Sequence, residues 1–363
     1  MRFPEFTDKW KECELQDVAS ISKGAGISKD QLSNTGEPCI LYGELYTKYK
    51  SEVITDVLSK TDIETANLVR SKANDVIIPS SGETAIDIST ARCVPFDNIL
   101  LGGDLNILRL KEQDGRFFSY QLNGVRKLDI AQIAQGVSVV HLYGESLKRL
   151  KVRYPSRSEQ EKISSLLASI DERITTQSRV IDKLESLIRG LEQQLLKPKG
   201  NWRICTIGDV LAIGSGKDYK HLSAGDIPVY GTGGYMLSVS DYLYDGDSVC
   251  IGRKGTIDKP LFMKGKFWTV DTLFYTYGFR DILPRYCYFL FQTINWQKYN
   301  EASGVPSLSK DTIERIRIAI PDIDEQKRIC LILDSIAEKV AIERSIQEQL
   351  VKEKNYLLRT MFV

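Results

Sequence analysis

The sequence repeats itself over most of its length, and this repeat constrains the fold more than any other feature. A segment beginning at Trp10, WKECELQDVASISKG, aligns with a segment beginning at Trp202, WRICTIGDVLAIGSG, at an offset of 192 residues. The alignment places Gly24 opposite Gly216. A repeat of this length indicates two copies of one domain rather than a solenoid of short units.

Further matches follow in the same order in both halves. They are GEPCILYG (36–43) with GDIPVYG (225–231), DVIIPSSGETAID (75–87) with DSVCIGRKGTID (247–258), QGVSVVHL (135–142) with SGVPSLSK (303–310), and SEQEKI (158–163) with DEQKRI (324–329). The last pair has an offset of 166, so the second copy lacks about 26 residues, mainly in its middle. The repeat predicts a domain at 1–158, a helix at 159–200, a second domain at 201–323 and a second helix at 324–363.

Composition excludes several classes of protein. The 363 residues are 42% hydrophobic and 27% charged, which is the balance of a globular chain rather than a disordered one. No stretch approaches the ~20 apolar residues of a membrane helix, and the N-terminal residues do not resemble a signal peptide. Seven scattered cysteines without a CxxC pair favour reduced thiols in a cytoplasmic protein over a zinc site or a disulfide framework. With only two histidines, we expect no metal site.

The first part of each copy contains short β-type runs, such as CILYGELY, DVIIPSS and SVCIG, separated by Gly, Pro, Asn and Asp. Helix candidates lie at 117–123 with 130–134, and at 284–293 with 295–301. We therefore predict an α+β fold with two similar, largely antiparallel β-rich domains, each followed by a long helix.

The helix from 159 to 196 carries a heptad pattern, in which apolar residues recur at alternating steps of four and three. These residues are Ile163, Leu167, Ile170, Ile174, Ile181, Leu184, Ile188 and Leu191. The second helix, 325 to 361, has a looser seam of Ile329, Leu333, Ile336, Val340, Leu350 and Leu357. Gln177 occupies a missing seam position and Glu343 the matching one. Either these two residues set the register of the helices or the coil loosens there and both are solvated.

The chain also carries longer motifs that resemble a known family. They are the FPEFTDKW opening, KGAGISKDQL with CILYGELYTKY, the junction GVPSLSKDTIERIRIAIPDIDEQKRI, and the C-terminal LLRTMFV. Over almost its whole length the chain is similar to the specificity subunit of type I restriction–modification enzymes. The resemblance implies that each β-rich domain is a target recognition domain that reads one half of a split double-stranded DNA sequence.

The resemblance has further implications for the helices and the partners. The two helices are expected to pack antiparallel, to separate the domains with pseudo-two-fold symmetry, and to set the spacing of the half-sites. They are also expected to bind two methyltransferase subunits, to which motor–nuclease subunits attach. This chain would bind no cofactor, and S-adenosylmethionine (AdoMet), ATP and Mg²⁺ would be held by the partner subunits.

Little in the sequence supports catalysis by the chain itself. It has no NPPY-type or DPPY-type methyltransferase motif and no GxGxxG after a strand. The GSGK run at 214–217 lacks the earlier Gly and the following Ser or Thr of a phosphate-binding loop. The acidic residues near Pro321 are too closely spaced for a metal-dependent nuclease. We therefore predict no catalytic residue.

Side chains that could contact DNA were sought among polar, basic and aromatic residues on turns and loops, because such groups reach phosphates and base edges. In the first copy they are Lys23, Lys29, Tyr42, Glu44, Tyr46, Thr47, Lys48, Ser80, Ser81, Thr84, Ser138 and His141. In the second copy they are Lys217, Lys220, Tyr230, Thr232, Tyr235, Arg253, Lys254, Thr256 and Ser307. Arg253 is the best candidate for guanine, since only Arg offers a two-pronged donor.

Other interpretations remain open. Tyr42 and Tyr230 are equally expected as half-buried core residues, a single Lys is more often simply solvated, and His141 is as readily a plain surface residue. The whole chain could also be a coiled-coil scaffold whose β domains bind protein rather than DNA, or a stand-alone nuclease or methyltransferase. DNA binding by the chain with its methyltransferase partner would argue against the scaffold, and AdoMet crosslinking to the isolated chain would favour the enzyme.

Overall fold

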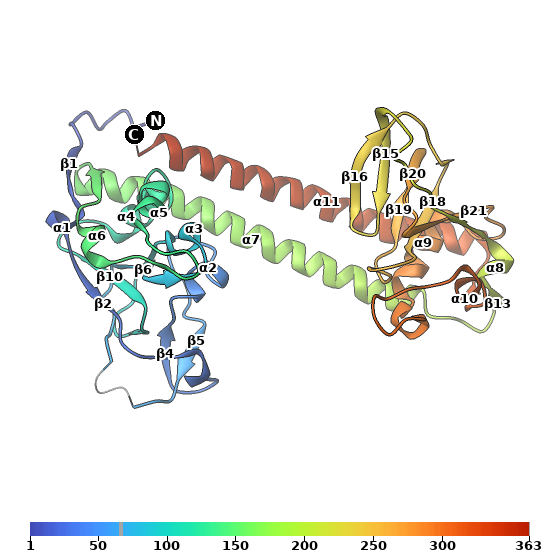
Figure 1. Cartoon of the computed structure of the whole chain (residues 1–363), viewed down its shortest axis with the longest axis horizontal. Coiled ribbons are helices and arrows are strands. Elements are labelled where there is room, and N and C mark those ends of the chain that lie inside the picture. The colour runs from blue at the N-terminus through green and yellow to red at the C-terminus, as the bar shows by residue number, and fades with distance from the viewer. Residues whose placement is uncertain (65–67, 363) are drawn as a thin grey trace. The chain divides into compact units, whose positions relative to one another are not determined.

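The computed structural model describes residues 1–64 and 68–362, and Figure 1 shows its elements. The chain divides into two compact units: unit 1 is Met1–Ser178 with Ser345–Val363, and unit 2 is Arg179–Arg344. The sequence-predicted ranges 1–158 and 324–363 include residues 65–67 and 363, which lie outside the described residues. Each unit contains one β-rich domain, half of the first long helix and half of the second.

The elements of the first domain are β1 (Lys11–Glu14), α1 (Leu15–Val18), β2 (Ala19–Lys23), the 3₁₀ turn η1 (Lys29–Gln31), β3 (Leu32–Ser33), β4 (Glu37–Ile40), α2 (Glu44–Thr47), β5 (Ser59–Thr61), β6 (Asp75–Pro79), β7 (Ser81–Gly82), α3 (Ala85–Ile88), β8 (Arg92–Val94), β9 (Leu100–Leu101), β10 (Leu105–Leu110), α4 (Gly115–Asn123), α5 (Lys127–Ile133), β11 (Val140–His141), α6 (Gly144–Lys148) and β12 (Lys151–Tyr154). The predicted β run CILYGELY is therefore wrong in its second half, because the chain turns into α2 at Glu44.

The elements of the second domain are β13 (Arg203–Thr206), α8 (Ile207–Val210), β14 (Ala212–Ser215), β15 (Ala224–Gly231), β16 (Gly234–Val239), β17 (Tyr244–Asp245), β18 (Ser248–Gly252), β19 (Leu261–Met263), β20 (Lys266–Thr269), β21 (Leu273–Tyr277), α9 (Pro284–Thr293), the 3₁₀ turn η2 (Trp296–Tyr299), α10 (Lys310–Glu314) and β22 (Arg317–Ile320). The long helices are α7 (Arg157–Leu195) and α11 (Ile323–Thr360). Each begins two residues earlier and ends one residue earlier than the heptad ranges 159–196 and 325–361, whereas the repeat-based ranges end at 200 and 363.

The central sheets of the two domains share one topology. The strand order is β2-β10-β6-β8 in unit 1 and β14-β21-β18-β19 in unit 2, and all neighbouring strands are antiparallel. A two-stranded ladder, β1 with β12 or β13 with β22, closes each domain immediately before its long helix begins. The predicted repeat of two α+β domains is thereby confirmed.

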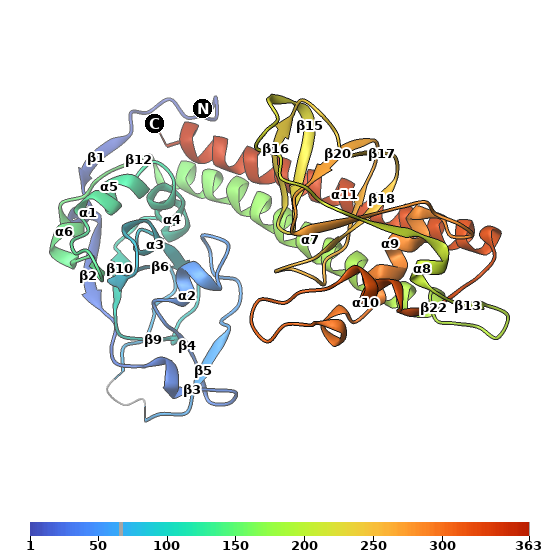
Figure 2. The ribbon, with the colours of Figure 1, turned by 45° about the vertical axis from the view of Figure 1, so that its right-hand side comes forward.

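A second sheet accompanies each central sheet and differs more between the units. Its order is β3-β5-β4-β9 in unit 1 and β16-β15-β20-β17 in unit 2. Both contain one parallel pair at the same place, β4 with β9 and β15 with β20. In unit 1 the β3–β5 region lies on the side of the domain remote from β1 and β12 (Figure 2).

Backbone hydrogen bonds fix the alignment of the repeats and correct two sequence matches. The N–H of Leu142 donates to the carbonyl oxygen of Ser80 at 2.9 Å, and the N–H of Leu308 donates to the carbonyl oxygen of Arg253 at 2.9 Å. His141 therefore corresponds to Ser307, so the match of QGVSVVHL with SGVPSLSK is displaced by two residues. Short apolar runs around a Gly carry no marker that prevents such a slip.

The two candidate tyrosines are likewise not equivalent. The N–H of Gly102 donates to Ile40 at 2.9 Å, and the N–H of Val270 donates to Tyr230 at 3.0 Å. Tyr230 thus occupies the place of Ile40, next to the parallel strand pair, rather than the place of Tyr42.

A buried glutamine joins each domain to its long helix. Gln160 Oε1 accepts a hydrogen bond from the N–H of Asp114 at 2.9 Å, and its Nε2 donates to the carbonyl of Pro155 at 3.0 Å. Asp114 caps α4, and Pro155 ends the β12 strand, so one amide ties two separate elements to the start of α7. Gln326 makes the same two bonds at 2.8 and 3.0 Å in unit 2. The shared EQ motif is therefore explained by a structural role.

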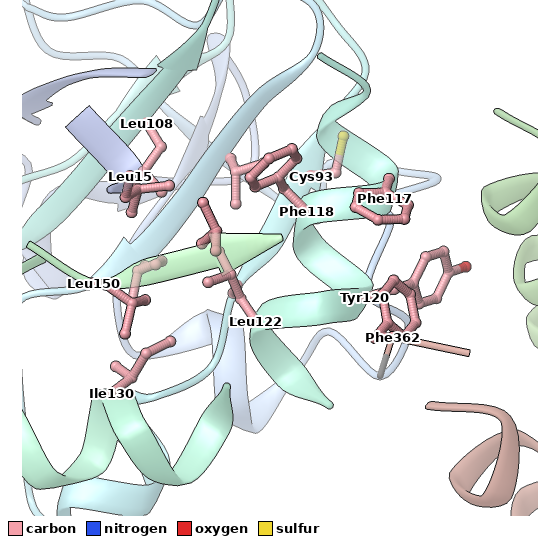
Figure 3. Close-up of a cluster of buried hydrophobic side chains, with 14 of the residues drawn as sticks. Leu15, Cys93, Leu108, Phe117, Phe118, Tyr120, Leu122, Ile130, Leu150 and Phe362 are labelled. Carbon is pink, nitrogen blue, oxygen red and sulfur yellow. The ribbon is translucent and has the colours of Figure 1, made fainter. Parts of the chain in front are cut away.

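The long helices also contribute to the domain cores. In unit 1 the aromatic residues of α4 pack beside Phe362, whose ring centroid lies 5.1 Å from that of Phe117 (Figure 3). The same cluster contains the seam residues Ile163, Leu167, Ile170 and Leu357, with Ile174 at its edge. Ile329 and Leu333 join the core of unit 2 together with Leu196 of the chain after α7. Of the other seam residues, Ile181, Val340 and Leu350 are buried, and Leu184, Ile188, Leu191 and Ile336 are half-buried. Part of each helix seam therefore packs against the core of a β-rich domain rather than against the other long helix.

Within each unit the halves of α7 and α11 run antiparallel. In unit 1 the Gln347 side chain donates to Ser178 Oγ at 2.6 Å, and in unit 2 Arg344 donates to Glu185. Glu343 is buried and forms an ion pair with Lys339 of its own helix.

A buried charged cluster of unit 1 joins both helices to the domain. Lys354 of α11 donates to the carboxylates of Asp171, on α7, and Glu52, in the domain. Tyr120 donates to the other oxygen of Asp171 at 2.7 Å. Burial, and then the nearby charge of Glu52, raises the pKa of Asp171 above its usual value. At the repeat offset of 166, unit 2 has Ile188 and Ala337 in place of Lys354 and Asp171, so the cluster belongs to unit 1 only.

Replacing Lys354 by Met should leave two buried carboxylates without their cation. We expect the free energy of unfolding at pH 7 to fall by about 3–5 kcal/mol. The ammonium of Lys354 lowers the pKa of Asp171 in wild type, so its loss should raise that pKa further. The folded variant then binds a proton more tightly than the unfolded chain does, and the deficit should shrink as the pH falls from 7 toward about 5. Denaturant unfolding of wild type and variant at both pH values measures it. Lys352→Met, at an exposed position of the same helix, is the control, and an equal deficit at both pH values would contradict the account.

The described residues were compared with the requirements for disulfides, metal sites and membrane-spanning helices. All seven cysteines lie in the described part and are free thiols. Among residues 1–64 and 68–362, no group of three or more His, Cys, Asp or Glu is arranged to hold a metal ion. Within the same ranges no helix has the length and apolar character needed to cross a membrane.

Candidate DNA interface

In each unit, one glycine allows two of the loops that carry the sequence-predicted candidates to approach closely. These glycines, Gly24 and Gly216, stand at equivalent places. A Cβ atom on Gly24 would lie 2.0 Å from the carbonyl oxygen of Gly102, and one on Gly216 would lie 1.9 Å from that of Val270. The chain that follows β2 or β14 can therefore cross directly over the turn before β10 or β21 only if this residue has no side chain. This close approach explains why glycine recurs here in both copies.

Several loops converge around this crossing in each unit. We call them loop end 1, residues 24–31, 41–48, 80–84, 102–104 and 135–141, and loop end 2, residues 216–220, 231–236, 253–256, 270–272 and 301–307. The N–H of Ser80 donates to the carbonyl oxygen of Asp104 at 2.7 Å, and the N–H of Arg253 donates to the carbonyl oxygen of Thr272 at 2.7 Å. The two loop ends thus share a backbone framework.

A hollow of about 670 Å³ opens in loop end 1. It is lined by five of the candidates, Lys29, Tyr42, Glu44, Thr47 and Lys48. Lys29, Thr47 and Lys48 are exposed, and Tyr42 is half-buried. Tyr46 is also half-buried, and burial raises its pKa. These five candidates, which were chosen from the sequence, therefore line one hollow in the folded chain.

Glu44 is a correction, because its carboxylate is buried and engaged within the protein. It accepts a hydrogen bond from the N–H of Leu41 at 3.0 Å and forms an ion pair with Lys48 at 2.6 Å. It stabilises the turn into α2, so its carboxylate is engaged within the protein although the residue lines the hollow. The charge of Lys48 is balanced by Glu44, which leaves Lys29 as the less compensated cation of this hollow.

The hydroxyl candidates on the turn after β6 differ in exposure. Ser80 and Ser81 are buried, and Ser81 pairs with His141 in the short β7–β11 ladder. Thr84 is exposed, but its hydroxyl caps α3 by accepting from the N–H of Asp87 at 3.1 Å. Of these three hydroxyls, that of Thr84 therefore serves local structure, and that of Ser80 is buried without a hydrogen-bond partner among the described residues. Elsewhere in the first domain, Lys23, Ser138 and His141 are exposed.

Loop end 2 has two hollows, of about 540 and 420 Å³. The first is lined by the candidates Lys220, Thr232 and Tyr235, and the second by Arg253, Lys254 and Ser307. Lys217 is exposed, and Thr256 is half-buried. Tyr230 is half-buried against the cluster that contains Phe267 and Met263, which agrees with the core interpretation of that residue.

Arg253 combines a fixed backbone with an exposed side chain. Its N–H donates to Thr272 at 2.7 Å, and its carbonyl accepts from Leu308 at 2.9 Å, so the backbone is fixed on both sides. The guanidinium remains exposed, with a single long contact of 3.4 Å to the carbonyl of Asp271. A fixed backbone reduces the entropy that an exposed Arg loses when it binds.

Sequence reasoning missed Lys310, which also lines the 420 Å³ hollow. It follows Ser309, whose hydroxyl caps α10 by accepting from the N–H of Thr312 at 3.1 Å. The SLSK run carried a signal for the helix start, because Ser is a favoured N-cap residue, and the half-buried Lys310 is the first residue after it.

Comparison with known proteins identifies the family. A profile described as "Type I restriction modification DNA specificity domain" matches residues 7–186 and 199–352, which together make up most of the chain. The chain belongs to this family. The two matched segments coincide with the two copies of the repeat, so the chain carries two specificity domains.

Among curated relatives, the specificity subunit of the type I restriction enzyme EcoprrI from Escherichia coli is 24% identical over 140 residues. That match covers 36% of this chain and 34% of the relative, so it spans about a third of the length of the relative.

Two solved structures share the fold of these specificity domains. The S subunit of a type I restriction–modification system from M. genitalium aligns with a TM-score of 0.71 and 17% identity, covering 100% of this chain and 99% of that chain. A chain from a structure of complex assembly and conformational transition in the type I R-M system aligns with a TM-score of 0.60 and 13% identity, covering 98% of this chain and 97% of that one.

Proposed function

We propose that this chain is the DNA sequence-recognition subunit of a type I restriction–modification complex, and that each loop end reads one half of a bipartite target. One observation carries the proposal. The two loop ends have the same backbone framework and different side chains upon it: where loop end 1 has Ser80 and Ser81, loop end 2 has Arg253 and Lys254. A constant framework with variable side chains suits two domains that read two different sequences.

Recognition divides into phosphate contacts and base reading. We assign Lys29, Lys220 and Lys254 to phosphates, because an ammonium on a mobile stem tolerates many geometries. We assign Arg253 to a guanine, whose O6 and N7 accept from both prongs of a guanidinium. With a net charge of +1, the whole chain has little cationic excess for binding phosphates, and partner subunits are expected to supply further contacts.

The chain performs no chemistry in this proposal. Methyltransferase subunits, bound along α7 and α11, would use AdoMet to methylate adenine, and motor–nuclease subunits that use ATP and Mg²⁺ would join the complex through them. A helix of 39 residues is ~58 Å long, sufficient to set the separation of two half-sites about one DNA turn apart. The complex would act in the cytoplasm, where reducing conditions suit the free thiols.

Exchange of residues 201–322 for the equivalent region of a relative tests modular reading. Because each domain has its own core and its own loop end, we expect one half of the methylated sequence to change and the other half to remain. Methylome sequencing of the host reads the result. The reciprocal exchange of the first domain is the matched control, and a single exchange that altered both halves would contradict the proposal.

Arg253→Lys tests the guanine assignment. The change retains the charge and removes the two-pronged donor, so we expect discrimination at one base pair of one half-site to weaken by about 1–3 kcal/mol. Lys254→Ala should instead weaken binding to all sequences and reduce the salt dependence. Competition binding with duplexes altered at each position measures both. Arg203→Lys, on β13, is the control, and unchanged discrimination in Arg253→Lys would refute the assignment.

A further inference from the structure

One apolar residue occupies the same place in both loop ends. Val139 is 53% exposed and Val305 is 66% exposed, and the offset of 166 that equates His141 with Ser307 also equates these two valines. They are the only residues shared between the aligned loop segments 136–140 and 302–306. Val137, which is 95% exposed in the same loop of unit 1, aligns with Ser303 and has no apolar counterpart in unit 2. Exposed apolar side chains are ordinary, but the presence of one at the same place in loops that otherwise differ calls for a reason.

The backbone holds each valine firmly. In unit 1 the N–H of Gln135 donates to His141 at 2.9 Å, and in unit 2 the N–H of Glu301 donates to Ser307 at 3.0 Å, so each loop is closed by a bond across its base. Gly136 has a φ of +119°, and a Cβ there would lie 2.1 Å from the carbonyl oxygen of Val139. The loop therefore closes tightly beside this valine.

The second loop is also tied to the candidate base-reading segment. The carbonyl of Pro306, the residue after Val305, accepts a hydrogen bond from the N–H of Gly255 at 2.9 Å. Lys254 pairs with Ser307 in an isolated β-bridge. Val305 thus projects from a loop that is bonded to the segment carrying Arg253 and Lys254.

The chemistry of DNA limits what such a valine can contact. In the major groove, the apolar group that base edges present is the C5-methyl of thymine. Side chains that wedge between base steps in the minor groove are longer or flatter than valine, such as Phe, Leu, Ile, Met and Pro. A short, branched side chain held at a loop tip fits a methyl group better than a gap between bases.

We propose that Val139 and Val305 each contact the C5-methyl group of a thymine in the half-site read by its own unit. This inference rests on the proposed DNA-reading function. It predicts that each half-site contains a T·A pair whose methyl group is itself a recognition determinant. The valine loops would act beside the charged residues of each loop end.

The test uses the full chain in complex with its methyltransferase subunits. Competition binding would compare the native duplex, whose target is known from methylome sequencing, with duplexes in which each thymidine in turn is replaced by deoxyuridine. This replacement removes the methyl group and retains base pairing. We expect one position in each half-site at which deoxyuridine weakens binding about fourfold, the ratio that corresponds to burying one methyl group.

Variants then assign each methyl group to its valine. Val305→Ala should lose about the same factor on native DNA and become insensitive to deoxyuridine at one position, while sensitivity in the other half-site persists. Val139→Ala should become insensitive to deoxyuridine at the position in the half-site of unit 1, while sensitivity in the half-site of unit 2 persists. Val305→Thr, which keeps one methyl group, should retain sensitivity. Ile204→Ala, at a 75% exposed position on β13, is the control and should retain both effects.

The outcomes separate the two proposals. If the wild-type complex does not distinguish its target from scrambled DNA, the proposed function fails, and this inference fails with it. If the complex distinguishes its target but deoxyuridine has no effect at any position, or the full effect survives in Val305→Ala and Val139→Ala, only the valine contact is overturned.

Discussion

Two buried glutamine amides hold the architecture of this chain together. Gln160 and Gln326 stand in the first turn of α7 and α11, and each uses its oxygen and its nitrogen to satisfy backbone groups of two other elements. A buried backbone N–H without a partner costs about 1–3 kcal/mol, so neither amide is readily replaced by an apolar residue. Since each glutamine lies in the first turn of its long helix, these bonds fix the direction in which the helix leaves its domain. The core of each unit, which includes the helix seam, depends on that direction.

The loop ends show how a domain of this kind can vary in what it reads. Gly24 and Gly216 make the same close crossing, and the hydrogen bonds of Ser80 and Arg253 to the turn beneath them have the same length. None of these interactions involves a side chain that faces outward. The outward residues can therefore change without moving the backbone, and the hollows of the two units differ in size and lining although the framework is shared. Specificity would then be set by a small number of exposed residues on a constant support.

Features of the fold that leave a signal within a short stretch of sequence were predicted, and features set by contacts between distant residues were not. The heptad ranges 159–196 and 325–361 gave the bounds of α7 and α11 within two residues, because a heptad pattern is visible in the sequence itself. The repeat was found for a similar reason. The pairing of Tyr42 with Tyr230 failed, since short apolar runs align equally well in several registers and only strand pairing selects one.

Burial and long-range contacts account for the rest. Glu44 was a candidate because it lies in a polar run, and only the folded chain shows that its carboxylate faces inward. The charged cluster of unit 1 joins residues 52, 120, 171 and 354, which no spacing rule connects. In contrast, several candidates chosen by their position after strands line the same hollows, and their contacts with DNA are proposals.

Photocrosslinking to DNA tests the central claim, that each unit reads its own half-site through its loop end, most directly. A photoreactive base would be placed in turn at each position of the bipartite target, bound by the chain with its methyltransferase subunits, and the crosslinked peptides identified by mass spectrometry. The account predicts that one half-site crosslinks to peptides from loop end 1 and the other half-site to peptides from loop end 2. Crosslinks from a single unit to both half-sites, or from the β1–β12 and β13–β22 ladders instead of the loops, would contradict it.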